Sequence, residues 1–138
     1  MPVHWEVDHA TRTVLAAAAG ELCLGDIEEY LDGMSRAATL SYRKLFDLSG
    51  CSSLLSKKEL LAWADRVNSF QSDIVIGPVA IVAVSEDAYD QARLFETLTA
   101  PRRRLRIFRD VEVAREWLNA EAVKASSSFS AAGDQEAA

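Results

Sequence analysis

The sequence predicts a single α/β domain in which one mixed, mostly parallel sheet of five strands packs with four helices. Short apolar runs with strand character alternate along the chain with longer segments whose apolar residues recur at helical spacing. The run at residues 79–84 has no polar alternation, which is typical of a strand that is buried on both faces of a sheet. The resulting order, β-β-α-β-α-β-α-β-α, favours parallel strands joined through covering helices.

The first two strands are expected to form an antiparallel hairpin. Apolar and polar residues alternate from Val3 to Val7, which is the period of a half-buried strand. A turn is predicted at residues 8–12, and the second strand at residues 13–19 is closed by Gly20. Because so few residues separate the two strands, they should pair antiparallel, with the first strand at an edge of the sheet.

Two predicted helices flank a third strand at residues 44–48. Asp26 is the predicted N-cap of the first helix, and acidic residues crowd its opening turns, where the helix dipole favours them. Ser56 begins the second helix, and the Ser-x-x-Glu pattern that it forms with Glu59 is a capping box. The apolar faces are predicted to carry Ile27, Leu31, Met34 and Ala38 on the first helix, and Leu60, Trp63 or Ala64, Val67 and Phe70 on the second.

The last predicted strand, at residues 105–108, lies between a third and a fourth helix, which Ser85 and Asp110 are expected to cap. The aligned apolar residues are Ala88, Ala92, Phe95 and Leu98 on the third helix, and Val111, Ala114, Trp117 and Leu118 on the fourth. From residue 123 the chain turns to small and polar residues with one aromatic. We therefore expect one domain over residues 1–122 and a disordered tail over residues 123–138.

Composition and charge narrow the classes of function. The chain has 138 residues, a formal net charge of −6 and a pI near 4.9, which disfavours general binding to nucleic acid or to anionic membranes. The amino-terminal residues lack the basic and apolar regions of a signal peptide, and no apolar run is long enough to span a bilayer. Cys23 and Cys51 form no C-x-x-C pair, so two free thiols and a cytoplasmic location are expected.

The stretch from Arg43 to Leu60 holds the candidate functional loop, because ligand and regulatory sites of open α/β sheets gather at the carboxyl ends of strands. Ser56 admits two interpretations. It is either a helix cap alone, or a phosphorylation site whose added charge the helix N-terminus and two neighbouring lysines would stabilise. The candidate regulatory or partner-binding residues are Asp47, Ser49, Gly50, Ser56, Lys57 and Lys58.

A catalytic or metal role for this loop is disfavoured. Asp47 is at a predicted strand end, where an aspartate commonly hydrogen-bonds the following turn. The sequence offers it no Asp/Glu/His cluster with ligand spacing, so we expect no metal. As a nucleophile, Cys51 would need a positioned base. His4 and His9, the only histidines, are expected at the surface of the amino-terminal hairpin.

Five arginines form the one basic cluster in this acidic chain. They could grip a phosphate, a phosphorylated partner or an acidic protein surface. Alternatively, they protect an exposed strand edge from unwanted pairing, an interpretation that the alternation of Arg104 and Arg106 with apolar residues supports. The cluster consists of Arg102, Arg103, Arg104, Arg106 and Arg109.

Three short segments, in this order and spacing, resemble the STAS domains and, more narrowly, the SpoIIAA-like group of small bacterial proteins. They are Asp47-Leu-Ser-Gly-Cys51, Tyr89-Asp-Gln-Ala-Arg-Leu-Phe-Glu96, and Arg106-Ile-Phe-Arg-Asp110 with the helix that follows. The resemblance spans about residues 3–120 and implies a mixed five-stranded sheet with a role in protein–protein regulation or small-ligand sensing. The signalling members carry an Asp-Ser-Ser-Gly-like segment where this chain has Leu55-Ser-Lys-Lys58, which argues against transferring their phospho-switch to Ser56.

The leading expectation is a non-catalytic regulatory or protein-interaction module that binds an unidentified protein partner or itself. The alternative is a carrier or sensor of a small apolar or anionic ligand, by analogy with the related Sec14-type domains. No dinucleotide-binding, P-loop or nucleophile-elbow motif is present, so we expect no cofactor and no enzyme of those types. Neither nucleic-acid binding nor membrane insertion is expected.

Overall fold

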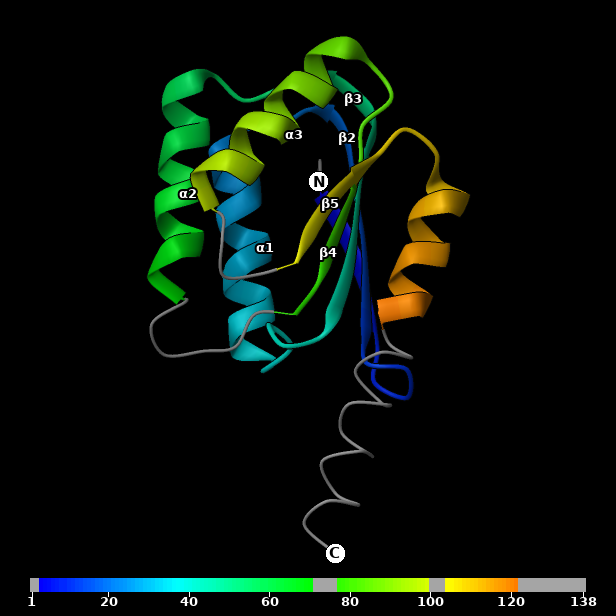
Figure 1. Cartoon of the computed structure of the whole chain (residues 1–138). Helices are drawn as coiled ribbons and strands as arrows, with labels where there is room; N and C mark the ends of the chain where they lie inside the picture. Colours follow the sequence, from blue (N-terminus) through cyan, green and yellow to red (C-terminus); the bar gives the residue numbers. More distant parts are fainter. Residues whose placement is uncertain (1–2, 71–76, 100–103, 122–138) are drawn as a thin grey trace, which may run out of the picture.

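The computed structural model describes residues 3–70, 77–99 and 104–121 of the chain (Figure 1). In chain order its elements are β1 (Val3–Asp8), β2 (Thr13–Glu21), α1 (Leu24–Arg36), β3 (Arg43–Ser53), α2 (Lys57–Phe70), β4 (Val79–Val82), α3 (Glu86–Thr99) and β5 (Leu105–Phe108). Residues 111–121 form a further helix, which we call the C-terminal helix. The predicted tail, Arg102, Arg103 and the side chain of Phe70 lie outside the described residues.

The sheet has the predicted mixed, mostly parallel topology. Its strand order is β1-β2-β3-β4-β5; β1 pairs with β2 antiparallel, and every later pairing is parallel. Because successive right-handed crossovers run in one direction across the sheet, their helices fall on the same face. Figure 1 shows α1, α2 and α3 on that face, with the C-terminal helix, drawn in orange, on the other.

Two cores follow from this layering. The larger core lies under α1, α2 and α3, where Ile27, Leu60 and Phe95 are buried against the sheet. The smaller core lies under the C-terminal helix, where Ala114 and Leu118 cover strand residues from β3 and β4. Every residue of β4 is buried, which confirms the prediction of a strand covered on both faces. Among the described helices, none has the length and apolar character needed to cross a membrane.

Two of the predicted helix caps are confirmed at α3 and the C-terminal helix. Ser85 Oγ accepts a hydrogen bond of 3.1 Å from the backbone N–H of Ala88. Asp110 Oδ1 accepts hydrogen bonds from the N–H groups of Glu112 and Val113, at 2.7 and 3.2 Å. Both residues therefore satisfy amides that a helix N-terminus leaves without an intrahelical acceptor.

The prediction for the ends of α1 was wrong. The helix begins at Leu24, so Cys23 is its N-cap, while Asp26 lies in the first turn and accepts a hydrogen bond from Cys23 Sγ at 2.8 Å. Ala38 lies beyond the helix and is exposed, whereas Ile27, Leu31 and Met34 are buried as predicted. The backbone of Ala38 has a φ of 58°, because the chain reverses there and the N–H of Thr39 donates a hydrogen bond to Met34 O.

The third strand is longer than predicted, since β3 continues from Arg43 to Ser53 rather than ending at residue 48. The end of β2 accompanies it, and Gly20 pairs with Cys51 beyond an irregularity in register. Conversely, β4 ends at Val82 rather than at residue 84, because pairing with β5 stops there. Small and hydroxyl residues after Leu48 resemble a loop in sequence, but pairing with β2 holds them extended.

Candidate functional site

An open groove lies at the edge of the sheet where the parallel strands β3 and β4 end and where α2 and α3 begin. Its volume is about 680 Å³. We call it the carboxyl-edge groove; it is lined by Cys51, Leu54, Leu55, Lys57, Leu60, Ser85, Asp87, Asp90, Gln91 and Leu94. In open α/β sheets this edge is where ligands bind.

The groove combines an apolar base with charged walls. Cys51, Leu54 and Leu94 are half-buried in it and leave apolar surface accessible. On one wall the exposed Lys57 begins α2, and on the other the exposed Asp87 and its neighbour Asp90 belong to α3. The lining therefore offers an apolar anchor point between charges of opposite sign.

Gln91 joins the two walls of the groove, and the sequence analysis did not single it out as a functional residue. Its Nε2 donates a hydrogen bond of 2.6 Å to Leu55 O, and its Oε1 accepts one of 3.2 Å from the N–H of Leu55. This two-bond contact ties α3 to the connection between β3 and α2, and so fixes the width of the groove. A lone glutamine inside a helix carries no sequence signal for such a role.

Ser56 and Glu59 form the predicted capping box at the start of α2. Ser56 Oγ accepts a hydrogen bond of 3.2 Å from the N–H of Glu59, and the N–H of Ser56 donates to Glu59 Oε1 at 3.0 Å. The second carboxylate oxygen, Oε2, accepts a bond of 3.1 Å from the N–H of Leu24. One carboxylate therefore joins the starts of α1 and α2, and phosphorylation of Ser56 stays a prediction.

Glu59 should make stability depend on pH in the acidic range. Hydrogen bonds from Ser56 and Leu24 lower the pKa of this carboxyl below its ordinary value. The ionised Glu59 should therefore stabilise the folded protein fully above the pKa that the residue has in the unfolded chain, about 4.3. This stabilisation should be lost as the pH falls through the lower pKa of the folded state. Glu59→Gln, which has one acceptor oxygen for two amides, should be less stable than the wild type at pH 7 and should match it more closely at pH 3.

Urea unfolding midpoints of both proteins, measured from pH 7 to pH 3, check this expectation. Glu112→Gln, on the exposed first turn of the C-terminal helix, is the matched control. A gap between wild type and Glu59→Gln that stays constant over this range would contradict the role assigned to the charge.

The remaining residues of the predicted loop do not converge on the groove. Asp47 Oδ1 accepts a hydrogen bond of 2.9 Å from the N–H of Ser49, so its carboxylate bonds to the local backbone as expected, although the strand continues there in place of the predicted turn. Asp47 also lines a separate hollow beside Arg115 of the C-terminal helix. Gly50 lies against β2, where a Cβ would come within 3.0 Å of Ala18 O. Of the six candidate residues, only Lys57 lines the groove.

The described arginines of the basic cluster contact separate partners. Arg104 forms an ion pair with the buried carboxylate of Glu121. Arg109 Nη2 lies 3.2 Å from Glu86 Oε1, and its guanidinium lies 4.3 Å from the centre of the Tyr89 ring. The arginines flank β5, which is an edge strand, as the edge-protection interpretation requires. An anion-binding or partner-binding patch at these residues stays a prediction.

Cys51 is the cysteine that lines the carboxyl-edge groove. Burial, with a smaller contribution from the charge of Asp47, raises the pKa of the Cys51 thiol. A thiol with a raised pKa stays protonated at neutral pH and is a poor nucleophile. Residues 3–70, 77–99 and 104–121 contain no group of three or more His, Cys, Asp or Glu side chains that could hold a metal ion.

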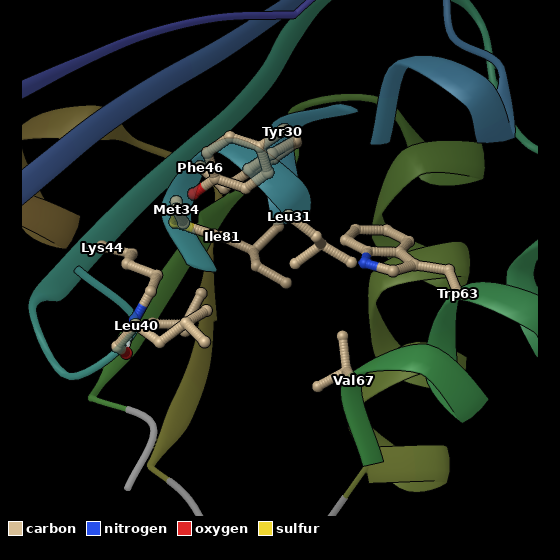
Figure 2. A pocket seen from close by; sticks show the side chains of 10 residues that line it. Tyr30, Leu31, Met34, Leu40, Lys44, Phe46, Trp63, Val67 and Ile81 are labelled. Carbon is tan, nitrogen blue, oxygen red and sulfur yellow. Dashed lines mark hydrogen bonds between the residues drawn. The ribbon is translucent and has the colours of Figure 1, made fainter. Parts of the chain in front are cut away.

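A second, smaller site lies between α1, α2 and the sheet (Figure 2). It is an apolar cavity of about 40 Å³, lined by Tyr30, Leu31, Met34, Leu40, Lys44, Phe46, Trp63, Val67, Val79 and Ile81. Trp63 is 8% exposed, and its Nε1 has no hydrogen-bond partner among the described residues. Figure 2 shows this nitrogen directed toward Leu31 and the interior of the cavity. The apolar spacing of α2 predicts Trp63 or Ala64 in the core, and both are buried, but it carries no signal for the unpaired donor of Trp63.

Comparison with known proteins establishes the fold. No protein-family model matches the sequence, and neither does any curated protein. Among solved structures, the chain is similar to an uncharacterized protein of the DUF3478 family from Shewanella loihica PV-4, which has a SpoIIAA-like fold. The two share 20% sequence identity with a TM-score of 0.59, over 84% of this chain and 93% of that chain. The predicted SpoIIAA-like fold is thereby confirmed.

Proposed function

We propose that this SpoIIAA-like chain is a non-catalytic regulatory module that binds a protein partner in the carboxyl-edge groove. The observation that carries the proposal is the lining of the groove, where the half-buried Leu54 and Leu94 lie between a lysine and two aspartates. Protein interfaces commonly combine a central apolar anchor with a polar rim. Small-molecule sites, in contrast, are usually enclosed enough to bury most of the ligand.

The charges on the walls define the chemistry of the partner segment. An apolar side chain would pack between Leu54 and Leu94, and a basic residue of the partner would face Asp87 and Asp90. An acidic residue would face Lys57 and the positive end of the α2 dipole. Such complementarity mainly raises the association rate and the specificity, and salt screens it.

The Cys51 thiol in the lining of the groove supports a binding role over a catalytic one. Cys51 is half-buried, and its raised pKa keeps the thiol protonated and apolar in character. It therefore extends the apolar surface formed by Leu54 and Leu94.

Reversing the charge of the α3 wall should disrupt partner binding. In affinity purification from the native cell, the double variant Asp87→Lys/Asp90→Lys should capture the partner about ten-fold less than the wild type, because like charges would then face each other. The matched control is Glu112→Lys/Glu116→Lys, which makes the same change of charge at exposed positions on the C-terminal helix. Equal capture by both variants, whether high or low, would contradict the placement of the site.

A second candidate function is the carriage or sensing of a small ligand. The specific observation that favours it is the unpaired Trp63 Nε1, a buried donor directed into an apolar cavity. The test is the binding of a dye or a small organic probe to the wild type and to Phe46→Trp, a variant that fills the cavity. Binding that Phe46→Trp abolishes would support this function. This function is compatible with partner binding in the carboxyl-edge groove, because the two sites have no lining residue in common and, of the helices, share only α2.

A further inference from the structure

We propose that the cavity beneath α1 and α2 binds a small, uncharged, apolar molecule carrying one hydrogen-bond acceptor, and that Trp63 Nε1 donates to this acceptor. The inference rests on the second candidate function, ligand binding in this cavity. It adds the chemical class of the ligand and the residue that selects it.

The indole N–H of Trp63 is a buried hydrogen-bond donor without an acceptor among the described residues. An indole N–H can donate but not accept, and buried polar groups in proteins almost always have a partner. Trp63 is held in place by stacking on Phe95, with ring centres 4.2 Å apart and planes inclined by 26°, and by a contact with Phe46. The aromatic neighbours fix the indole so that its nitrogen faces the cavity (Figure 2). An acceptor in the cavity would complete the hydrogen bonding of this group.

Water is a poor occupant of this cavity. A cavity of about 40 Å³ has room for a water molecule, but a buried water needs at least two polar partners. Figure 2 shows the apolar side chains of Leu31 and Val67 beside Trp63, whereas the Tyr30 hydroxyl lies on the side of Met34. The ammonium of Lys44 lies on the opposite side of the cavity in Figure 2, where it donates to Tyr42 O at 2.8 Å and also to Leu40 O. A water bonded to Trp63 would therefore lack further partners near the indole.

The volume and the apolar lining of the cavity limit the size and charge of the ligand. A cavity of about 150 Å³ is the size that admits benzene, so this cavity of about 40 Å³ suits a molecule of only a few heavy atoms unless flexible lining residues move. Met34 is the most adaptable of these residues, because its unbranched side chain changes rotamer readily. A charged ligand would lose its hydration in a lining that is almost wholly apolar. Small ketones and ethers meet the chemical requirements, and one of about five heavy atoms enters only where Met34 and its neighbours move to enlarge the cavity.

The test compares 2-butanone with 2-methyl-1-butene, a hydrocarbon of the same shape in which a methylene group replaces the oxygen. Both are titrated into the wild type and into Trp63→Phe, while the indole N–H resonances of the three tryptophans are followed by NMR. The ketone should move the Trp63 resonance downfield and leave those of Trp5 and Trp117 in place. The ratio of the ketone affinity to the alkene affinity should fall about ten-fold in Trp63→Phe, which is the loss of one neutral hydrogen bond.

The outcomes separate the two proposals. If both compounds bind and their affinity ratio is the same in Trp63→Phe, ligand binding stands and the assignment of the acceptor is wrong. If neither compound binds, both proposals fail. A water molecule that shows a nuclear Overhauser effect to the Trp63 indole in the ligand-free protein would also overturn the inference. Because the resonance shift is measured in the wild type, the test holds even if Trp63→Phe folds poorly.

Discussion

Replacing Gly77 with alanine is expected to lower the free energy of unfolding by about 3 kcal/mol. A Cβ at this position would lie 2.4 Å from the carbonyl oxygens of Ser41 and Tyr42 and 2.8 Å from the carbonyl carbon of Tyr42. These are backbone atoms just before β3, and the N–H of Lys44 is itself bonded to Pro78 O at 2.9 Å. Because neither segment can move without losing strand pairing, the clash should separate β3 from β4.

Urea unfolding followed by circular dichroism measures this effect, and two other glycines provide a graded comparison. A Cβ at Gly33 would meet Trp5 Cζ2 at 2.7 Å, so Gly33→Ala should cost less, since a side chain can shift. A Cβ at Gly25, in the first turn of α1, would have no neighbour within 4 Å. Gly25→Ala should therefore be neutral or stabilising, because alanine favours the helix. A Gly77→Ala protein as stable as Gly25→Ala would contradict the close approach of Gly77 to the backbone of Ser41 and Tyr42.

Replacing Phe46 with alanine should cost about 3–5 kcal/mol, a large part of the total stability of a domain of this size. Phe46 is 4% exposed on the central strand β3. Its ring centre lies 5.3 Å from that of Tyr30 on α1 and 6.0 Å from that of Trp63 on α2. The substitution would remove the side chain that contacts both helices and would enlarge the cavity beneath them.

Calorimetry of Phe46→Ala should show a melting temperature at least about 10 °C below that of the wild type. Leu61→Ala, on the solvent side of α2 with the native residue 42% exposed, should change stability by no more than about 0.5 kcal/mol. If the two variants melted at similar temperatures, the assignment of Phe46 to the centre of the larger core would be wrong.

The sequence was sufficient for most of the fold because its elements are marked by local chemistry. The alternation from Val3 to Val7 predicted the edge hairpin, and Ser56, Ser85 and Asp110 marked three helix starts by their capping bonds. These signals act over a few residues, so they survive without knowledge of the tertiary structure. The SpoIIAA-like resemblance, which is confirmed at the level of the fold, depended on the order of such segments.

The errors occurred where distant contacts override local preference. The residues after Leu48 are small or polar, a composition that predicts a loop, but they pair with the end of β2. Ala38 continues the helical spacing of α1, yet the chain has already turned at that point. Neither pairing nor chain reversal could be inferred from the spacing of apolar residues alone.

The candidate site was predicted only in part, for the same reason. The segment after residue 48 was predicted to form the functional edge of the sheet, and the groove at that edge takes its opposite wall from Asp87, Asp90 and Gln91 on α3. Gln91 contacts Leu55 across 36 positions of sequence, and no local motif announces that contact. The unpaired Nε1 of Trp63 likewise depends on how three helices and the sheet pack around one ring.

Hydrogen exchange of the complex with the captured partner tests whether that partner binds in the carboxyl-edge groove. The first amides of α2 and α3 have no intrahelical acceptors, so those of Lys57, Glu86 and Asp87 should exchange readily in the free protein. Binding should slow exchange at these amides and at Leu54, and leave the C-terminal helix unchanged. Slowed exchange confined to the C-terminal helix or to β5, with the groove amides unaffected, would contradict the account.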